Sequence, residues 1–469
     1  PNLPMWRPLV GWLFLVVSIK YLWQARVGKN SLLAYARHVA SDFYTNKLNA
    51  WDKWIVALVI VALLSLTVAD FPGHGLKQIV FVFNTYLLYL ASLLAISSTD
   101  DWTKLLKYLK FSVLITVALG FLQYFVTFLS DPYYFWQYWA TFISATYYGQ
   151  PLAEVLAYSN SWFSAEASGE NSLRMFGILQ DTHAFAVIVI FGMAIWWALA
   201  KQDVTATRAR HLFQKQTYWY WVVLALLGFA IIASGTRGVW VAMAIPMAAV
   251  LILIYKFKAR LLGALPLLSF TLVIILFLLS PWITMSFNFL RSVALEDNFL
   301  RRAASVYDLS EDSNMGRIEI WKGSLSYSLQ HPLGTGYGNF ITSIVDAPEA
   351  ASFEEISEQK NLRYNLPQKF ITAHSLYLHI LVELGLIGLI LFLIFWLSVA
   401  KQTWRAISEA QFSFSALNLF FVAVAIALLW LLAYGLFDVT ILNERVLLYL
   451  MTLFALLNMA LRHKPLTLF

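Results

Sequence analysis

Long apolar runs separated by short polar segments dominate the chain. Most of these runs approach the ~20 residues that a helix needs to cross a bilayer. Continuous apolar runs favour membrane helices over a β-barrel, whose strands alternate apolar and polar residues. The pattern predicts eleven spans, at residues 9–23, 54–69, 77–97, 107–129, 183–200, 218–234, 238–256, 261–281, 375–399, 413–436 and 445–462.

Composition supports this fold class. Of the 469 residues, 60% are hydrophobic and only 13% are charged, whereas about a quarter of a soluble domain is charged. We therefore predict an all-α, polytopic helical membrane protein with about 11–12 transmembrane helices and a long helical periplasmic segment. Cysteine is absent, which excludes a disulfide framework and a thiolate metal site.

Positive residues in the loops set the predicted orientation, because cytoplasmic loops of membrane proteins are enriched in lysine and arginine. Every second loop along the chain is rich in these residues, which are Arg26, Lys29, Arg37, Lys47, Lys104, Lys107, Lys110, Lys201, Arg208, Arg210, Lys215, Lys256, Lys258, Arg260, Lys401, Arg405, Arg462 and Lys464. The net charge of +7 follows this topology and does not indicate nucleic-acid binding. Eleven spans would place Pro1 outside, so we expect a twelfth span that lies before Pro1 or escapes the pattern.

Two long outer segments divide the chain into five expected parts. These are N-terminal transmembrane helices at 1–130, a periplasmic aromatic-rich interfacial segment at 131–182, central transmembrane helices at 183–281, a large periplasmic segment at 282–374 and C-terminal transmembrane helices at 375–469. Aromatic residues concentrate at membrane interfaces, so the first outer segment predicts a helix lying in the interface. The second carries charges of both signs and predicts short helices that cap the spans.

His374 is the first candidate for chemistry, because it stands where the longest polar segment meets an apolar run. Neutral imidazole, with a reference pKa of about 6.5, accepts a proton at neutral pH, so His374 is a candidate general base. The alternative is a helix-end histidine that bonds a neighbour. His379 would point to a different helix face and fits packing.

Several arginines are candidates for binding an anion. Arg237 lies in a tight glycine-containing turn between two apolar runs, and a guanidinium held there could grip a phosphate bidentately. Arg317 lies on a predicted short helix, with Glu319 off its face. The alternatives are a span anchor for Arg237 and an ordinary surface residue for Arg317. Further substrate-binding candidates are Arg174, Arg291 and Tyr337.

Two other kinds of site find little support. The cluster Gly334–Gly338 lacks the strand, helix and Gly-Lys-[Ser/Thr] ending of a nucleotide loop, and therefore predicts a tight turn. No metal-ligand spacing is present, so we expect neither a metal nor another cofactor.

These features together resemble the O-antigen ligase/polymerase superfamily of bacterial envelope glycosyltransferases, over roughly residues 170–400. His374-Ser375, nine residues, then Gly385-Leu386-Ile387-Gly388 fits the family pattern His-[Asn/Ser/Gln], nine residues, Gly-x-x-[Gly/Thr/Tyr]. Ser234–Gly238 resembles its Ser-x-[Ser/Thr]-Arg-Gly turn, and Arg317 to Gly336 resembles its Arg…Trp…Pro-x-Gly-x-Gly block. The chain departs at Asp181-Thr182-His183, where many members carry Pro-Asn.

The resemblance implies a donor glycan on undecaprenyl diphosphate and an acceptor hydroxyl on lipid A-core oligosaccharide. The enzyme would act in the bacterial inner membrane, with its site facing the periplasm and with membrane lipids as its surroundings. His374 would deprotonate the acceptor while Arg237 and Arg317 stabilise the departing diphosphate, an inverting and metal-independent transfer. The oligomeric state stays open.

Other functions remain as alternatives. An O-antigen polymerase or a protein O-oligosaccharyltransferase would share the same motifs. A transporter or lipid flippase would place ionisable residues near the bilayer midplane, and Glu383 is the main residue that fits such a protein.

Overall fold

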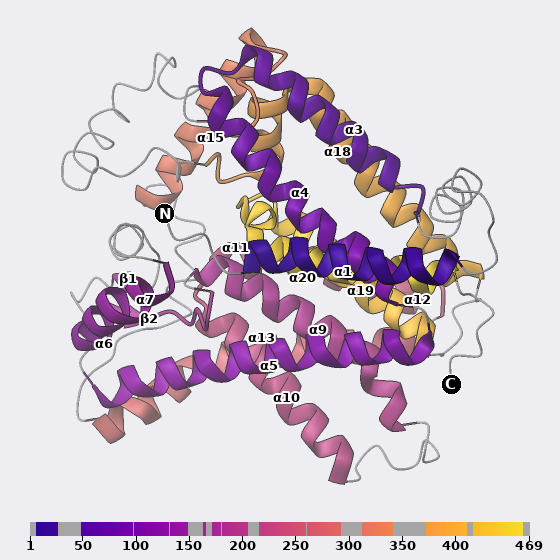
Figure 1. Cartoon of the computed structure of the whole chain (residues 1–469). Helices are drawn as coiled ribbons and strands as arrows, with labels where there is room; N and C mark the ends of the chain where they lie inside the picture. The colour runs from indigo at the N-terminus through magenta and orange to yellow at the C-terminus, as the bar shows by residue number, and fades with distance from the viewer. Residues whose placement is uncertain are drawn as a thin grey trace.

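The computed structural model describes residues 6–26, 48–96, 98–130, 132–148, 163–165, 171–179, 181–204, 215–258, 260–291, 312–340, 372–409 and 416–462. Nearly all of these residues are helical (Figure 1). The strands β1 (Phe163–Ala165) and β2 (Asn171–Leu173) form one small antiparallel ribbon that pairs Phe163 with Leu173. The prediction of an all-α polytopic membrane protein is confirmed, with this ribbon as a minor addition.

Every predicted span coincides with a helix. Seven spans are long and apolar enough to cross a membrane, and they are formed by α4 (Pro72–Ala95), α5 (Thr99–Leu129), α9 (Thr182–Val204), α11 (Arg237–Ala242) continued by α12 (Ala244–Lys256), α18 (Leu376–Glu409), α19 (Ala416–Tyr434) and α20 (Glu444–Arg462). Shorter apolar stretches lie in α1 (Trp6–Arg26), α10 (Lys215–Ala233) and α13 (Arg260–Arg291). The remaining predicted span, 54–69, corresponds to α3 (Asp52–Ser65), which has 14 residues. At 1.5 Å per residue this helix is about 21 Å long, which is less than the thickness of a bilayer core.

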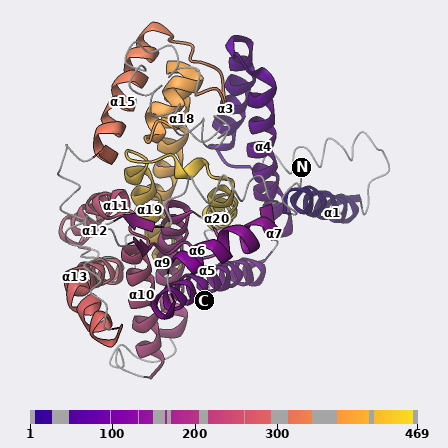
Figure 2. The ribbon, with the colours of Figure 1, turned by 90° about the vertical axis from the view of Figure 1, so that its left-hand side faces the viewer.

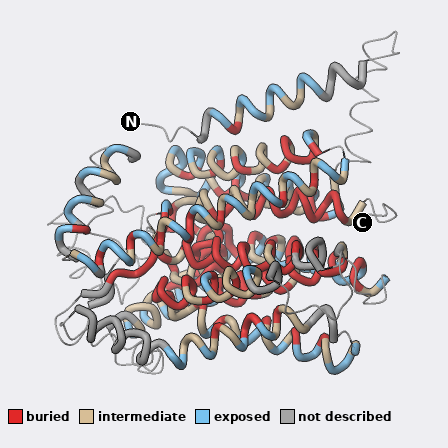
Figure 3. The backbone as a smooth tube through the Cα atoms, turned by 90° about the horizontal axis from the view of Figure 1, so that it is seen from below, coloured by how far each residue is buried: buried red, intermediate tan, exposed pale blue. Residues whose placement is uncertain are grey.

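Helix α9 forms the centre of the core. Its most apolar stretch is 89% buried, compared with 28% for that of α5. Buried residues concentrate in the middle of the helical bundle (Figure 3). A helix that is apolar on all sides is stable only when other helices surround it, and α9 packs against α5, α10 and α19. Two buried tryptophans of this core have partners for their indole N–H groups, as Trp197 donates to Ser269 Oγ at 2.8 Å and Trp430 to the Val239 carbonyl at 2.9 Å.

A glycine break interrupts α18 and receives the loop 331–340. Gly385 has a φ of +66°, inside an otherwise helical segment. The break frees backbone groups that the loop satisfies: the Thr335 and Gly336 N–H groups donate to the Val382 and Glu383 carbonyls at 2.8 and 3.0 Å. The Leu386 N–H in turn donates to the Pro332 carbonyl at 3.1 Å. The glycine cluster is therefore a turn that docks on a broken helix.

The same loop also binds the hairpin of α3 and α4. The Tyr337 N–H donates to Ser65 Oγ at 3.0 Å, and the Phe71 N–H donates to Asn339 Oδ1 at 2.8 Å. Helix α15 (Asp312–Gln330) leads into the loop and lies beside α18 (Figure 2). The segment predicted to cap the spans is therefore helical in this described part.

The aromatic outer segment is helical as well. It comprises α6 (Pro132–Tyr138), a π-helical stretch at Trp139–Ser144 and α7 (Ala145–Tyr148). Tyr134, Tyr138 and Phe142 recur every four residues and are all exposed. Their position at a membrane interface stays a prediction.

Candidate functional site

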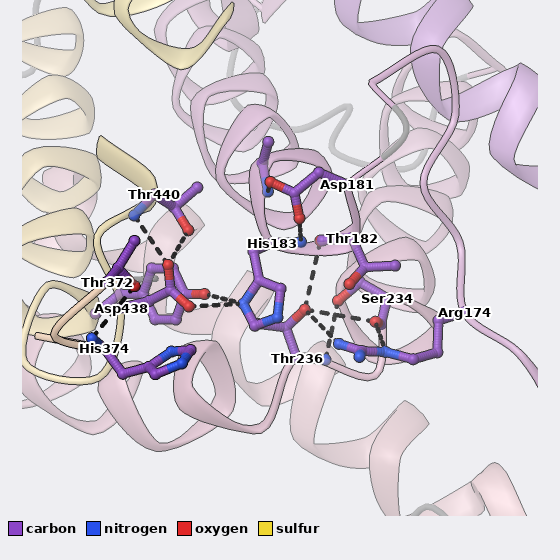
Figure 4. Close-up of polar contacts among 12 residues, drawn as sticks. Arg174, Asp181, Thr182, His183, Ser234, Thr236, Thr372, His374, Asp438 and Thr440 are labelled. Atoms are coloured by element: carbon purple, nitrogen blue, oxygen red, sulfur yellow. Dashed lines mark hydrogen bonds and ion pairs between the residues drawn. The ribbon is translucent and has the colours of Figure 1, made fainter. Parts of the chain in front are cut away.

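Helix ends and loops from distant parts of the chain meet in one polar cluster (Figure 4). These segments are residues 181–183 at the start of α9, the turn 234–238 before α11, residues 372–375 before α18, the loop 435–440 between α19 and α20, and Arg317 on α15. Asp438, Arg317 and His183 all act electrostatically on the pKa of His374.

His183 and Asp438 form the most closely paired ionisable groups of this cluster. His183 Nδ1 lies 3.0 Å from Asp438 Oδ2 and 2.6 Å from the Tyr434 hydroxyl. Thr440 fixes the other carboxylate oxygen, since its backbone N–H donates to Asp438 Oδ1 at 2.9 Å and its hydroxyl also bonds that atom. Burial alone would raise the pKa of Asp438, but His183 and Thr440 hold that pKa well below its usual range. Asp438 is therefore a carboxylate.

Asp181 sets the position of His183 by capping α9. Its Oδ1 accepts from the His183 N–H at 2.9 Å and its Oδ2 from the Ala184 N–H at 3.3 Å, as an N-cap carboxylate does. Burial raises the pKa of Asp181, and the nearby His183 opposes that effect. The cap places His183 in the first turn of the helix, with its ring towards the 435–440 loop.

His374 has an unusual backbone, with a φ of +46°. Non-glycine residues rarely adopt this conformation, and such strained residues concentrate at functional sites. The backbone is held on both sides of His374, because the Ala373 carbonyl accepts from Trp321 Nε1 at 3.0 Å and the Leu376 N–H donates to the Gly435 carbonyl at 2.7 Å. Within the described part of the chain, the buried His374 Nδ1 has no hydrogen-bond partner.

The surroundings of His374 keep its ring neutral. Burial lowers its pKa to about 4, and the charges of Arg317 and His183 act in the same direction, while Asp438 opposes them. A neutral imidazole at pH 7 is able to accept a proton, although this burial makes it a weak base. The role of His374 as general base stays a prediction.

Trp321 lies four residues after Arg317, on the same face of α15. The hydrogen bond from Trp321 to Ala373 joins this face to the segment that carries His374. Glu319 is exposed on another face, as its spacing predicts.

Arg237 ends the turn at 234–237, whereas Arg174 follows β2 and contacts this turn from outside. Arg174 is 7% exposed, and its Nε donates to the Ser234 carbonyl at 2.9 Å while its Nη2 contacts Thr236 Oγ1 at 3.3 Å. Arg174 thus holds the turn in place. A Cβ at Gly238 would lie 3.0 Å from Tyr434 and from Phe437, so the turn packs closely on the loop that carries Asp438. This packing brings the half-buried Arg237 to the same region.

The other two binding candidates lie elsewhere. Tyr337 is part of the loop that docks on α18, and its described contacts are with Ser65 and Asn339. Arg291 ends α13, but its side chain lies outside the described residues.

Sequence reasoning missed Asp438 and Tyr434. It named His183 as part of a departure from the family pattern and as one of two residues too few for a cation site. The available signal was an isolated acid in Gly435-Leu436-Phe437-Asp438, between two apolar runs. Such a residue indicates a function only once its partner is known.

Part of the chain matches a known protein family. Residues 222–393 match the family model described as O-antigen ligase, a segment that holds the Arg237 turn, α15, the docking loop and the start of α18. No curated protein matches the chain. His183 and Asp438 lie outside the matched segment. Over this segment the chain is therefore similar to the O-antigen ligase family, and its apolar helices are those of a multi-pass membrane protein.

Proposed function

We propose that the protein is an O-antigen ligase that transfers a polysaccharide from undecaprenyl diphosphate to a hydroxyl of lipid A-core, at the periplasmic face of the bacterial inner membrane. The observation that carries this proposal is the convergence of His374 and Arg317 within a chain that is similar to this family. A proton acceptor and a cation at one site are what the transfer of a glycan from a diphosphate requires.

The residues at the two ends of the same helices support the proposed periplasmic location of the cluster. His374 precedes α18, whereas Lys401 and Arg405 lie near the end of that helix. Arg237 begins α11, whereas Lys256 ends α12, which continues the same span. Because lysine and arginine favour the cytoplasmic side, the cluster belongs to the other side of the membrane.

The proposed reaction is a single displacement. The acceptor oxygen forms a bond to the anomeric carbon as the bond from that carbon to the diphosphate oxygen breaks, and the configuration inverts. His374 takes the acceptor proton, and the electron pair of the broken bond leaves on the diphosphate. Arg237 and Arg317 stabilise the charge on this leaving group, which is the part that a metal ion plays in other transfers.

Glu383, the residue that best fitted a transporter, has a local structural role. Its Oε1 accepts from the Phe340 N–H at 3.2 Å, and it lies 3.5 Å from His379 Nε2. Glu383 thus binds the docking loop, which weakens the argument for transport.

The test uses purified protein with lipid A-core acceptor, undecaprenyl-diphosphate glycan and a chelator, and compares wild type with His374→Ala. Transfer by wild type that is lost in a folded His374→Ala variant supports a metal-independent ligase with a histidine base. Elongated lipid-linked glycan without transfer to core would identify a polymerase, and transfer to protein serine or threonine an oligosaccharyltransferase. Unimpaired transfer by His374→Ala would contradict the mechanism.

A further inference from the structure

His183 is a titratable residue at the site that the mechanism above does not use. Its described side-chain contacts are with Asp438 and Tyr434, and both are made by Nδ1 (Figure 4). The side chain keeps 22% of its surface exposed. Asp181 fixes the backbone below it through the cap of α9. Nε2 is therefore the ring atom that these contacts leave for another partner.

Asp438 determines what Nε2 can do. A carboxylate 3.0 Å from Nδ1 favours the tautomer that carries its hydrogen on Nδ1, because that hydrogen can then be donated to the carboxylate. The lone pair of the neutral ring is then on Nε2. When Nε2 takes up a proton, the same carboxylate faces the positive ring and stabilises it, as in a catalytic triad.

His374 has the opposite surroundings. Its Nδ1 has no hydrogen-bond partner within the described residues, and the neighbouring Arg317 carries a positive charge. A proton on His374 is consequently held in an unfavourable place, whereas a proton on His183 faces a carboxylate. The two histidines lie in the same polar cluster (Figure 4), and they act on each other electrostatically.

We propose that His183 is a second proton-accepting residue of the transfer, and that the proton removed by His374 passes to His183 Nε2 and from there to water. The acceptor O–H bond breaks, the new C–O bond forms at the anomeric carbon, and the diphosphate leaves with the electron pair of the old bond. His374 returns to its neutral form for the next turnover. This inference rests on the proposed function.

The first test is chemical rescue in full-length protein. His183→Ala opens a space for a small base, and we expect its transfer rate to fall about 100-fold and to recover as imidazole is added. His331→Ala is the matched control, since the exposed His331 ring stacks on Tyr327 with centroids 4.2 Å apart. An unchanged rate in His183→Ala would overturn the proposal. So would a loss of rate that imidazole does not restore, because a purely structural histidine behaves in that way.

The second test does not depend on turnover, so it separates this inference from the proposed function. Nitrogen chemical shifts of ¹⁵N-histidine report the tautomer of each ring, and the signal missing in His183→Ala assigns His183. We expect wild type to carry its hydrogen on Nδ1, and Asp438→Asn to lose this preference. Hydrogen on Nε2 in wild type would overturn the proposal. Absence of any transfer by wild type would instead overturn the proposed function alone.

Discussion

Trp321 donates its indole N–H to the Ala373 carbonyl, one residue before His374. This bond joins α15, which carries Arg317, to the start of α18. In this chain it therefore gives Trp321 a structural link to the segment that carries His374. The tryptophan orients the two candidate catalytic segments, and the arginine on the same helix face reaches the site.

Replacing Trp321 with phenylalanine should therefore lower activity more than stability. The ring still packs, but the Ala373 carbonyl loses its donor, a net loss of about 1 kcal/mol. We expect the transfer rate to fall about 10-fold, because small displacements of catalytic groups have large effects on rate. Rates and thermal unfolding of Trp321→Phe should be compared with Trp12→Phe, whose ring is 64% exposed on α1. Equal rates in the two variants would contradict this role.

Gly385→Ala should disrupt the docking of loop 331–340 on α18. A Cβ at this position would lie 2.3 Å from the Pro332 carbonyl oxygen, and the φ of +66° is itself unfavourable for alanine. We expect a destabilisation of roughly 1–3 kcal/mol for the strain, seen as a lower midpoint of thermal unfolding. Gly323→Ala is the control, because a Cβ there meets no atom within 4 Å. A midpoint in Gly385→Ala as high as in this control would show that the break tolerates a side chain.

Arg237→Lys should reduce transfer even though the charge is kept. A lysine lacks the planar fork that binds two phosphate oxygens at once. We expect about a 10-fold to 100-fold loss in kcat/KM for the lipid-diphosphate donor, with normal folding. Arg405→Lys is the control, since Arg405 is exposed and pairs with Glu409 at 3.7 Å at the far end of α18. If both variants retain full activity, Arg237 serves only to anchor its span.

Acid should destabilise the protein through His374. Its pKa is lowered from 6.5 to about 4 in the folded protein, so the unfolded chain binds the proton more tightly. The contribution to stability is therefore complete above about pH 6.5, and is lost progressively as the pH falls from there through about 4. We expect His374→Gln to weaken this pH dependence. Unfolding midpoints between pH 7 and pH 4 measure it, and the same acid dependence in wild type and in His374→Gln would refute the assignment.

The sequence by itself determined the membrane helices of this protein. Lipid cannot hydrogen-bond the backbone, so each span needs its own continuous apolar run, and such runs are visible without knowledge of neighbouring helices. The predicted span at 54–69 shows the limit, because α3 has only 14 residues. Motif spacing likewise indicated His374, Arg237 and Arg317, because local turns and helix faces hold these residues.

Only the tertiary structure decided what the glycines do and which residues complete the site. The motif included Gly385 without explaining why a glycine is needed there. The structure gives the explanation, which is close contact with the backbone of Pro332, a residue far earlier in the sequence. Arg174, predicted to bind substrate, also has a structural contact that the sequence did not reveal, because its side chain donates to the turn before Arg237. Asp438 and His183 are far apart in the sequence, and an isolated charge carries no spacing signal. Their pairing depends on how α9, α19 and α20 pack, which no local pattern encodes.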